Sequence, residues 1–197
     1  MTSLFKLTER VVVVTGATGA LAGSAADYLA AEGARVVYLG RSQAKLDAAL
    51  ARCRLRTPTA QCLGLVADVL DQPALELAKD RVQEKWGRID ALINGAGGNM
   101  PGATISPGKL FEDLDFQSFQ QMVDLNLHGT VLPSLVFVPA MVTGGRGQLV
   151  LNNMPFGRFG DAEELHGAIH YLLADSSKFV TGTILPIDGG FVATSGV

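Results

Sequence analysis

The chain has 197 residues, of which 48% are hydrophobic and 18% charged, and this composition predicts one domain with a substantial buried core. Its net charge of -3 provides no basic field, so nucleic-acid binding is not expected. Cys53 and Cys62 match no zinc-binding spacing and are too few for a disulfide framework, so two idle thiols in a reducing cytoplasm are expected. The N-terminus lacks a signal-peptide pattern, and no stretch reaches the roughly 20 apolar residues of a membrane span. We therefore expect a cytoplasmic protein that does not associate with a membrane.

Along the chain, strand patterns alternate with helix patterns. This order predicts an α/β fold of the Rossmann type, a doubly wound parallel sheet in a three-layer α/β/α arrangement. The β-branched and apolar runs predict strands over residues 10–15, 35–39, 61–67, 89–94, 148–151 and 183–187. Helices are predicted over residues 21–31, 42–54, 72–86, 116–142 and 161–174, the long one bent by Pro133 and Pro139.

The first predicted strand leads into a glycine-rich turn and then a helix. Gly16 and Gly19 lie in this turn, where the absence of Cβ atoms would let a pyrophosphate approach the backbone amides at the positive end of the helix. Thr15 and Thr18 add hydroxyl groups. The alternative is a tight strand-to-helix connection that binds no ligand.

On these residues the chain resembles the short-chain dehydrogenase/reductase family, whose opening motif is T-G-x-x-x-G-x-G. Thr15 and Gly16 match that motif, whereas its later glycines fall on Ala20 and Ala22. Further along, Asp68 and Val69 are similar to the family's adenine-contacting pair. Residues 94–97 are similar to its N-N-A-G motif, with a glycine in place of the second asparagine.

The resemblance implies a dinucleotide site and no metal centre. Asn126 stands where the family keeps a helix asparagine that orders a proton-relay water, and it is the one catalytic residue that carries over. His166 and His170 lie four positions apart on a predicted helix, but no third ligand accompanies them. The implied cofactor-binding residues are Thr15, Gly16, Thr18, Gly19, Leu21, Arg41, Asp68, Val69, Asn94, Gly95, Ala96 and Gly97.

The choice of dinucleotide depends on the residues after the second strand. The position of the acid that binds ribose hydroxyls in NAD-dependent proteins is occupied by Gly40, and Arg41 follows. A guanidinium suits a 2′-phosphate, so the sequence favours NADP over NAD. If Arg41 is only a solvated charge at a helix start, NAD remains open.

Residues 95–104, 157–160 and 190–197 resemble the branch of the family formed by D-mannonate oxidoreductases. The resemblance implies hydride transfer between NAD(P) and a secondary alcohol or ketone, here of a small sugar acid. It also implies a homodimer or homotetramer through the long helix, although burial in the core would produce the same apolar pattern.

The family's catalytic Ser, Tyr and Lys are absent from this chain. No tyrosine is followed four positions later by a lysine, and Asn152, Asn153 and Met154 stand where the Ser is expected. Residues 1–197 are thus expected to form one dinucleotide-binding domain that lacks a strand and the catalytic helix, with the junction near residues 152–154. The sequence does not distinguish a real deletion from a segment left out of the chain.

Two interpretations follow from this absence. By family the protein is an NAD(P)-dependent enzyme, and the chain as it stands is expected to be inactive without the missing segment. The alternative is a catalytically dead protein that binds a dinucleotide or stabilises another subunit.

Overall fold

The computed structural model describes residues 5–106, 108–143, 148–151 and 161–187. Five parallel strands form one sheet in the order β3-β2-β1-β4-β5. They are β1 (Val11–Thr15), β2 (Arg35–Gly40), β3 (Cys62–Val66), β4 (Ala91–Asn94) and β5 (Gln148–Leu151). The strand order reverses between β1 and β4, and ligands of open parallel sheets bind at such a switch point.

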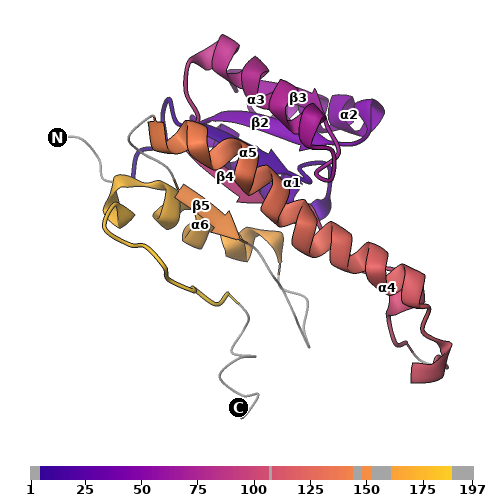
Figure 1. The fold of residues 1–197 in the computed structure, drawn as a ribbon. Helices are drawn as coiled ribbons and strands as arrows, with labels where there is room; N and C mark the ends of the chain where they lie inside the picture. The colour runs from indigo at the N-terminus through magenta and orange to yellow at the C-terminus, as the bar shows by residue number, and fades with distance from the viewer. Residues whose placement is uncertain (1–4, 107, 144–147, 152–160, 188–197) are drawn as a thin grey trace.

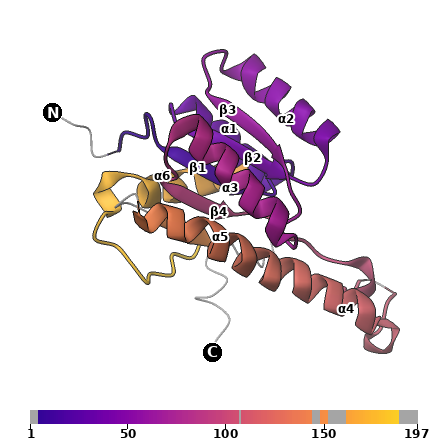
Figure 2. The ribbon, with the colours of Figure 1, turned by 45° about the horizontal axis from the view of Figure 1, so that its top comes forward.

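Helices cover both faces of the sheet (Figure 1, Figure 2), which confirms the doubly wound fold. The core on one face is packed by α1 (Ala20–Ala31), α2 (Gln43–Arg56) and α6 (His166–Leu173). The core on the other face is packed by α3 (Gln72–Trp86) and α5 (Gly129–Thr143). In β1, Val12 and Val14 face the first core and Val11 and Val13 the second, which explains its continuous apolar run.

The helix ends follow local signals in the sequence. Ser42 caps α2 by accepting a hydrogen bond from the Lys45 amide, and the Asp71 carboxylate accepts one from the Ala74 amide at the start of α3. Gly87 ends α3 with φ of 71°, a left-handed conformation that favours glycine.

The predicted long helix is present as one span made of three parts. These are α4 (Phe116–Val123), the π-helical η3 (Asp124–His128) and α5, which contains both Pro133 and Pro139. In Figure 1 and Figure 2, α4 extends away from the sheet while α5 lies across it. The loop before this span contains two short 3-10 turns, η1 (Pro101–Ala103) and η2 (Phe111–Asp113).

The same span, Phe116–Thr143, is long and apolar enough by composition to cross a membrane, which corrects the expectation that no such stretch occurs. The span qualifies by its mean hydropathy and its few charged residues, and not by an unbroken run of apolar residues. Buried core helices pass the same test; here 28% of the qualifying window is buried, and Phe137 and Met141 of α5 lie against the sheet.

The C-terminal part departs from prediction at one element. The predicted helix is present as η4 (Ala162–Leu165) followed by α6, with η5 (Asp175–Ser177) after it. The predicted strand over 183–187 is wrong, because these residues form no strand and Ile184 is 89% exposed. A strand needs a neighbour to bond to, and no described strand lies beside this segment. The junction at 152–154 and the segments 157–160 and 190–197 lie outside the described residues.

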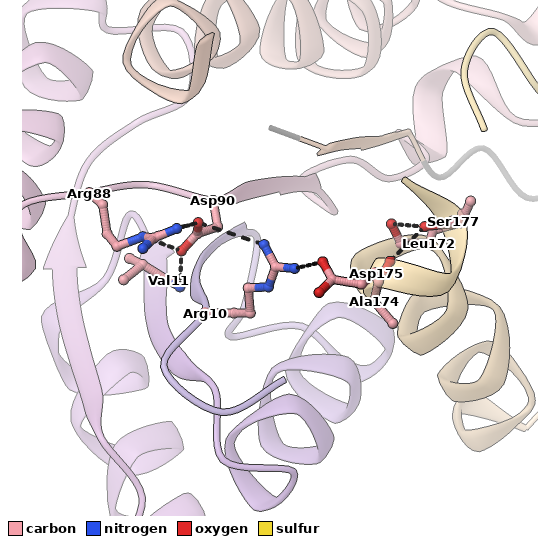
Figure 3. Close-up of polar contacts among 8 residues, drawn as sticks. All are labelled: Arg10, Val11, Arg88, Asp90, Leu172, Ala174, Asp175 and Ser177. Carbon is pink, nitrogen blue, oxygen red and sulfur yellow. Dashed lines mark hydrogen bonds and ion pairs between the residues drawn. The ribbon is translucent and has the colours of Figure 1, made fainter. Parts of the chain in front are cut away.

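A buried carboxylate holds the opposite end of the sheet together (Figure 3). Asp90 accepts hydrogen bonds from the Val11 amide at 2.8 Å and from Arg88 Nε at 2.9 Å. Arg10 forms an ion pair with Asp90, and its Nη2 also donates to the carboxylate of Asp175 at 2.5 Å. This network ties the region after α6 to the start of β1, far from the switch point.

Candidate dinucleotide-binding site

The candidate site begins where β1 and β4 end side by side. Thr15 pairs with Asn94 in the sheet, and its buried hydroxyl oxygen accepts hydrogen bonds from the Gly95 and Ala96 amides, both at 3.1 Å. A single threonine side chain therefore fixes the two loops that leave the sheet at its switch point.

Gly16 is required in the turn for two separate reasons. Its φ of +66° is unfavourable for other residues, and a Cβ there would lie 2.6 Å from the Gly95 carbonyl oxygen. The Gly19 amide donates to the Gly16 carbonyl at 2.8 Å, and α1 starts directly after it without a side-chain cap. The first amides of α1 are thus available to an anion at the positive end of the helix.

Gly95 and Ala22 form a matched pair across this junction. A Cβ on Gly95 would lie 2.5 Å from the Ala22 Cβ and 2.9 Å from the Thr15 carbonyl oxygen. Two departures from the family motifs, alanine for glycine in the turn and glycine for asparagine after β4, therefore meet in space. The sequence revealed each departure but not their contact.

Asn94 is almost completely buried beneath this junction. Its Nδ2 donates to Ser134 Oγ at 3.0 Å, while its Oδ1 has no hydrogen-bond partner among the described residues. Buried acceptors of this kind are normally paired. Ser134 comes from α5 and lies 40 positions away, so sequence reasoning missed it.

Asn126 holds the loop that follows β4. Its Oδ1 accepts from the Gly98 amide at 3.1 Å, and its Nδ2 donates to the Gly98 carbonyl at 2.9 Å. A Cβ on Gly97 would lie 2.7 Å from that Oδ1, and the Thr130 hydroxyl donates to the Asn126 carbonyl at 3.0 Å. The π-helical segment places Asn126 beside the loop, and such segments often occur at functional sites.

Arg41, Asp68 and Val69 follow the ends of β2 and β3, and Leu21 lies in the first turn of α1. Arg41 Nη1 lies 3.8 Å from Asp68 Oδ2, and the Arg41 side chain is 69% exposed. A Cβ on Gly40 would lie 3.2 Å from Thr18 Cγ2, so the glycine turn and the end of β2 are close. Val69 is buried in the core beneath α5, and Leu21 packs in a half-buried position against the core on the α1 face.

An open cavity of about 500 Å³ adjoins the glycine turn and is lined by the start of α1, the last turns of α2 and residues 161–163. Thr18 and Gly19 are the only predicted site residues in its lining, and neither Arg41 nor Asp68 contributes to it. Arg52 at its edge is already paired, since its Nε donates to the Asp27 carboxylate at 2.8 Å. The cavity therefore touches one end of the predicted site without containing it.

The histidine pair packs against α1. His166 Nε2 lies 3.2 Å from Ser24 Oγ, and its ring stacks on Tyr28 with centroids 4.3 Å apart. His170 Nδ1 lies 3.0 Å from the Tyr28 hydroxyl, and its Nε2 lies 2.5 Å from the Phe5 carbonyl oxygen. Burial lowers the pKa of His166. These contacts assign both rings to the contact between α1 and α6.

Comparisons with known proteins bear on the family of this chain. A family model described as short chain dehydrogenase matches residues 10–158, about three quarters of the chain. The chain belongs to the short chain dehydrogenase family. A second model, described as enoyl-(acyl carrier protein) reductase, matches residues 146–192.

Alignments with several known proteins cover nearly the whole chain. The uncharacterized oxidoreductase UxuB of Bacillus subtilis is 28% identical, over 97% of this chain and 98% of its own. Levodione reductase of Leifsonia aquatica is 26% identical, over 94% and 95%. A crystal structure described as a D-mannonate oxidoreductase from Haemophilus influenza with bound NAD has a TM-score of 0.81 at 24% identity and covers 98% of both chains.

The alignment with the Bacillus protein is longer than this chain. It runs over 273 positions, whereas the chain has 197 residues, so at least 76 aligned positions have no counterpart here. The Bacillus protein is therefore longer than this chain, although the alignment covers nearly all of both.

Proposed function

We propose that this chain is a nicotinamide-dinucleotide-binding protein of oxidoreductase type, whose reaction, with the missing catalytic segment present, would be hydride transfer between NAD(P) and a secondary alcohol or ketone of a sugar acid. The observation that carries the proposal is the junction of Thr15, Gly16 and Gly95, where backbone approaches backbone so closely that a Cβ on either glycine would clash. Membership of the short chain dehydrogenase family supports it, as does the bound NAD of the Haemophilus structure.

The residues present fit a dinucleotide. In the proposal, the turn from Gly16 to Leu21 and the first amides of α1 bind the pyrophosphate, and Asp68 and Val69 border the adenine. The loop from Asn94 to Gly97 borders the nicotinamide half, where the unpaired Asn94 Oδ1 would gain a partner. The nicotinamide itself would supply the hydride chemistry.

The sugar-acid substrate is proposed from the names of similar proteins. Besides the D-mannonate oxidoreductase structure, a 2-keto-3-deoxy-D-gluconate dehydrogenase from Streptococcus agalactiae covers 98% of this chain with a TM-score of 0.76. Both names describe sugar acids or their keto forms.

We propose further that the 197-residue chain binds the dinucleotide without turning over. A catalytic phenol needs a pKa lowered toward working pH. Here burial raises the pKa of Tyr28 and of Tyr38, and the Tyr38 hydroxyl donates to Asp27 at 2.9 Å in the core. Tyr171 has Asp175, not a lysine, four positions later. The 76 or more unmatched positions of the Bacillus alignment leave room for the missing catalytic segment.

A homo-oligomer through the long helix remains part of the proposal. Phe116 and Phe119 of α4 and Leu135 of α5 are exposed, at 71%, 46% and 65%. Sedimentation of the purified chain tests this proposal, and a monomer at tens of micromolar would contradict it.

Binding is tested by titrating the chain with NADPH and NADH and following the fluorescence of the reduced nicotinamide. Saturable binding is expected for the native chain, and Gly16→Ala is expected to abolish it because the new Cβ displaces the Gly95 loop. Gly167→Ala is the matched control, since nothing lies within 4 Å of a Cβ there. Thermal melting of both variants separates loss of binding from loss of folding, and a native chain that binds neither dinucleotide would refute the proposal.

Turnover is tested separately by following NADPH and NADH oxidation with a keto-sugar acid. The native chain is expected to stay at the rate of the protein-free control. Turnover above that rate would overturn the inactive interpretation while leaving the family assignment intact.

A further inference from the structure

The two cysteines of the chain lie in contact on neighbouring elements. Cys53 is on the last turns of α2 and Cys62 is the first residue of β3, and their Sγ atoms are 3.5 Å apart. Their proximity depends on how closely α2 lies over β3, since a Cβ on Gly64 would come within 2.8 Å of Leu50 Cδ1. Sequence spacing alone indicated two idle thiols, and packing of a helix on a strand brings them together.

The surroundings hold this helix in place. Tyr38 on the adjacent strand β2 donates to Asp27 Oδ1 at 2.9 Å, and Arg52, next to Cys53 in α2, donates to the other oxygen of Asp27 at 2.8 Å. One buried carboxylate of α1 therefore fixes both β2 and α2. The hydrogen bonds of Asp27 to Tyr38 and Arg52 therefore hold α2 against the sheet, and this packing keeps the two sulfur atoms close.

Access to the two sulfur atoms is unequal. Cys53 is 1% exposed, whereas Cys62 is partly exposed at the start of its strand. An oxidant in solution therefore reaches Cys62 first, and Cys53 is positioned to react second.

We propose that Cys53 and Cys62 form a reversible intramolecular disulfide when the protein meets a peroxide. The Cys62 thiolate attacks one peroxide oxygen, the O–O bond breaks, and the departing oxygen leaves as water, so that Cys62 becomes a sulfenic acid. Cys53 then attacks that sulfur, its proton leaves with the expelled hydroxide as a second water, and the S–S bond forms. The peroxide is reduced by two electrons and the two thiols are oxidised by two.

The reaction at this site is slow compared with dedicated redox sensors. Burial raises the pKa of Cys62 to about 12, so little thiolate is present at neutral pH. The disulfide would join α2, which starts just after Arg41, to β3, which ends just before Asp68. The disulfide would therefore join α2 and β3 at their ends away from the Arg41–Asp68 ion pair.

The test is to treat the folded, reduced chain with hydrogen peroxide and then to block remaining thiols with iodoacetamide under denaturing conditions. Loss of about 2 Da and no alkylation are expected for the intramolecular disulfide, and dithiothreitol is expected to restore both thiols. Arg54 and Arg56 lie between the cysteines, so trypsin separates them and a crosslinked pair of peptides identifies the bond. Cys53→Ser is expected to stop at a sulfenic acid on Cys62, trapped by dimedone, with no loss of mass.

Three results would overturn the proposal. These are a native chain that keeps both thiols after peroxide treatment, a disulfide that joins two chains on a non-reducing gel, or overoxidation of Cys62 with Cys53 still a free thiol. Circular dichroism of the treated chain confirms that the reaction occurred in the folded protein.

Discussion

The contact of Gly95 with Ala22 predicts that the cost in stability of a methyl group at position 95 depends on which residue occupies position 22. In the native chain, the Cβ of Gly95→Ala would lie 2.5 Å from the Ala22 Cβ and 2.9 Å from the Thr15 carbonyl oxygen. Both distances are well inside van der Waals contact, in a region fixed by the buried Thr15 hydroxyl. Overpacking of this kind costs about 2–3 kcal/mol of unfolding free energy.

Removing the methyl of residue 22 should relieve most of this cost. Ala22→Gly alone is expected to cost about 0.5–1 kcal/mol, because glycine weakens a helix and leaves a small void. In that background, the Cβ of Gly95→Ala still lies 2.9 Å from the Thr15 carbonyl oxygen, and the substitution is expected to cost about 1 kcal/mol. The double-mutant cycle therefore predicts a favourable coupling of about 1–2 kcal/mol between the two sites.

Urea unfolding of the four proteins measures this cycle. With a slope of about 2–3 kcal/mol/M, Gly95→Ala alone should lower the midpoint by about 1 M. Gly167→Ala serves as the control, because a Cβ there meets open space and is expected to leave the midpoint unchanged or raised. If the effects of the two substitutions add within about 0.5 kcal/mol, the proposed packing of this loop on α1 is wrong.

Three further predictions concern other parts of the molecule. Asp90→Ala removes the buried acceptor of the Val11 amide and is expected to cost about 2–3 kcal/mol in urea unfolding, with Asp90→Asn costing less because it keeps an acceptor oxygen; equal losses would show that the charge of Asp90, and not its acceptor oxygen, carries the stabilisation. Arg41→Glu is expected to weaken NADPH binding about tenfold or more while leaving NADH binding nearly unchanged, and an equal effect on both would exclude Arg41 as the 2′-phosphate ligand. His166 has a pKa lowered by burial, so its contribution to stability is present above the unfolded pKa of about 6.5 and is lost as pH falls from there toward the folded value. His166→Phe, which keeps the stack on Tyr28, should reduce the dependence of the urea midpoint on pH in that range, and an unchanged dependence would place its origin elsewhere.

The local part of the candidate site was predictable because its signals lie within a few residues of one another. The turn from Thr15 to Gly19 follows from a buried strand, two glycines and a helix start, and the structure places Gly16 in the conformation that requires glycine. The position of Asn126 on the long helix was likewise predictable. Its bonds to the Gly98 backbone were not, because they depend on where the helix crosses the loop after β4.

The sequence by itself determined the family resemblance, the alternation of strands and helices and the absence of the catalytic Tyr and Lys, since each depends on residue type and short-range spacing. Only the tertiary structure decided that Gly95 meets Ala22, that Asn94 bonds to Ser134 and that Cys53 touches Cys62. It also decided that residues 183–187 form no strand, although their composition favours one. The physical reason is common to all four: a contact or a hydrogen-bonded ladder needs a partner brought close by the packing of other elements, and spacing along the chain does not encode that partner's distance.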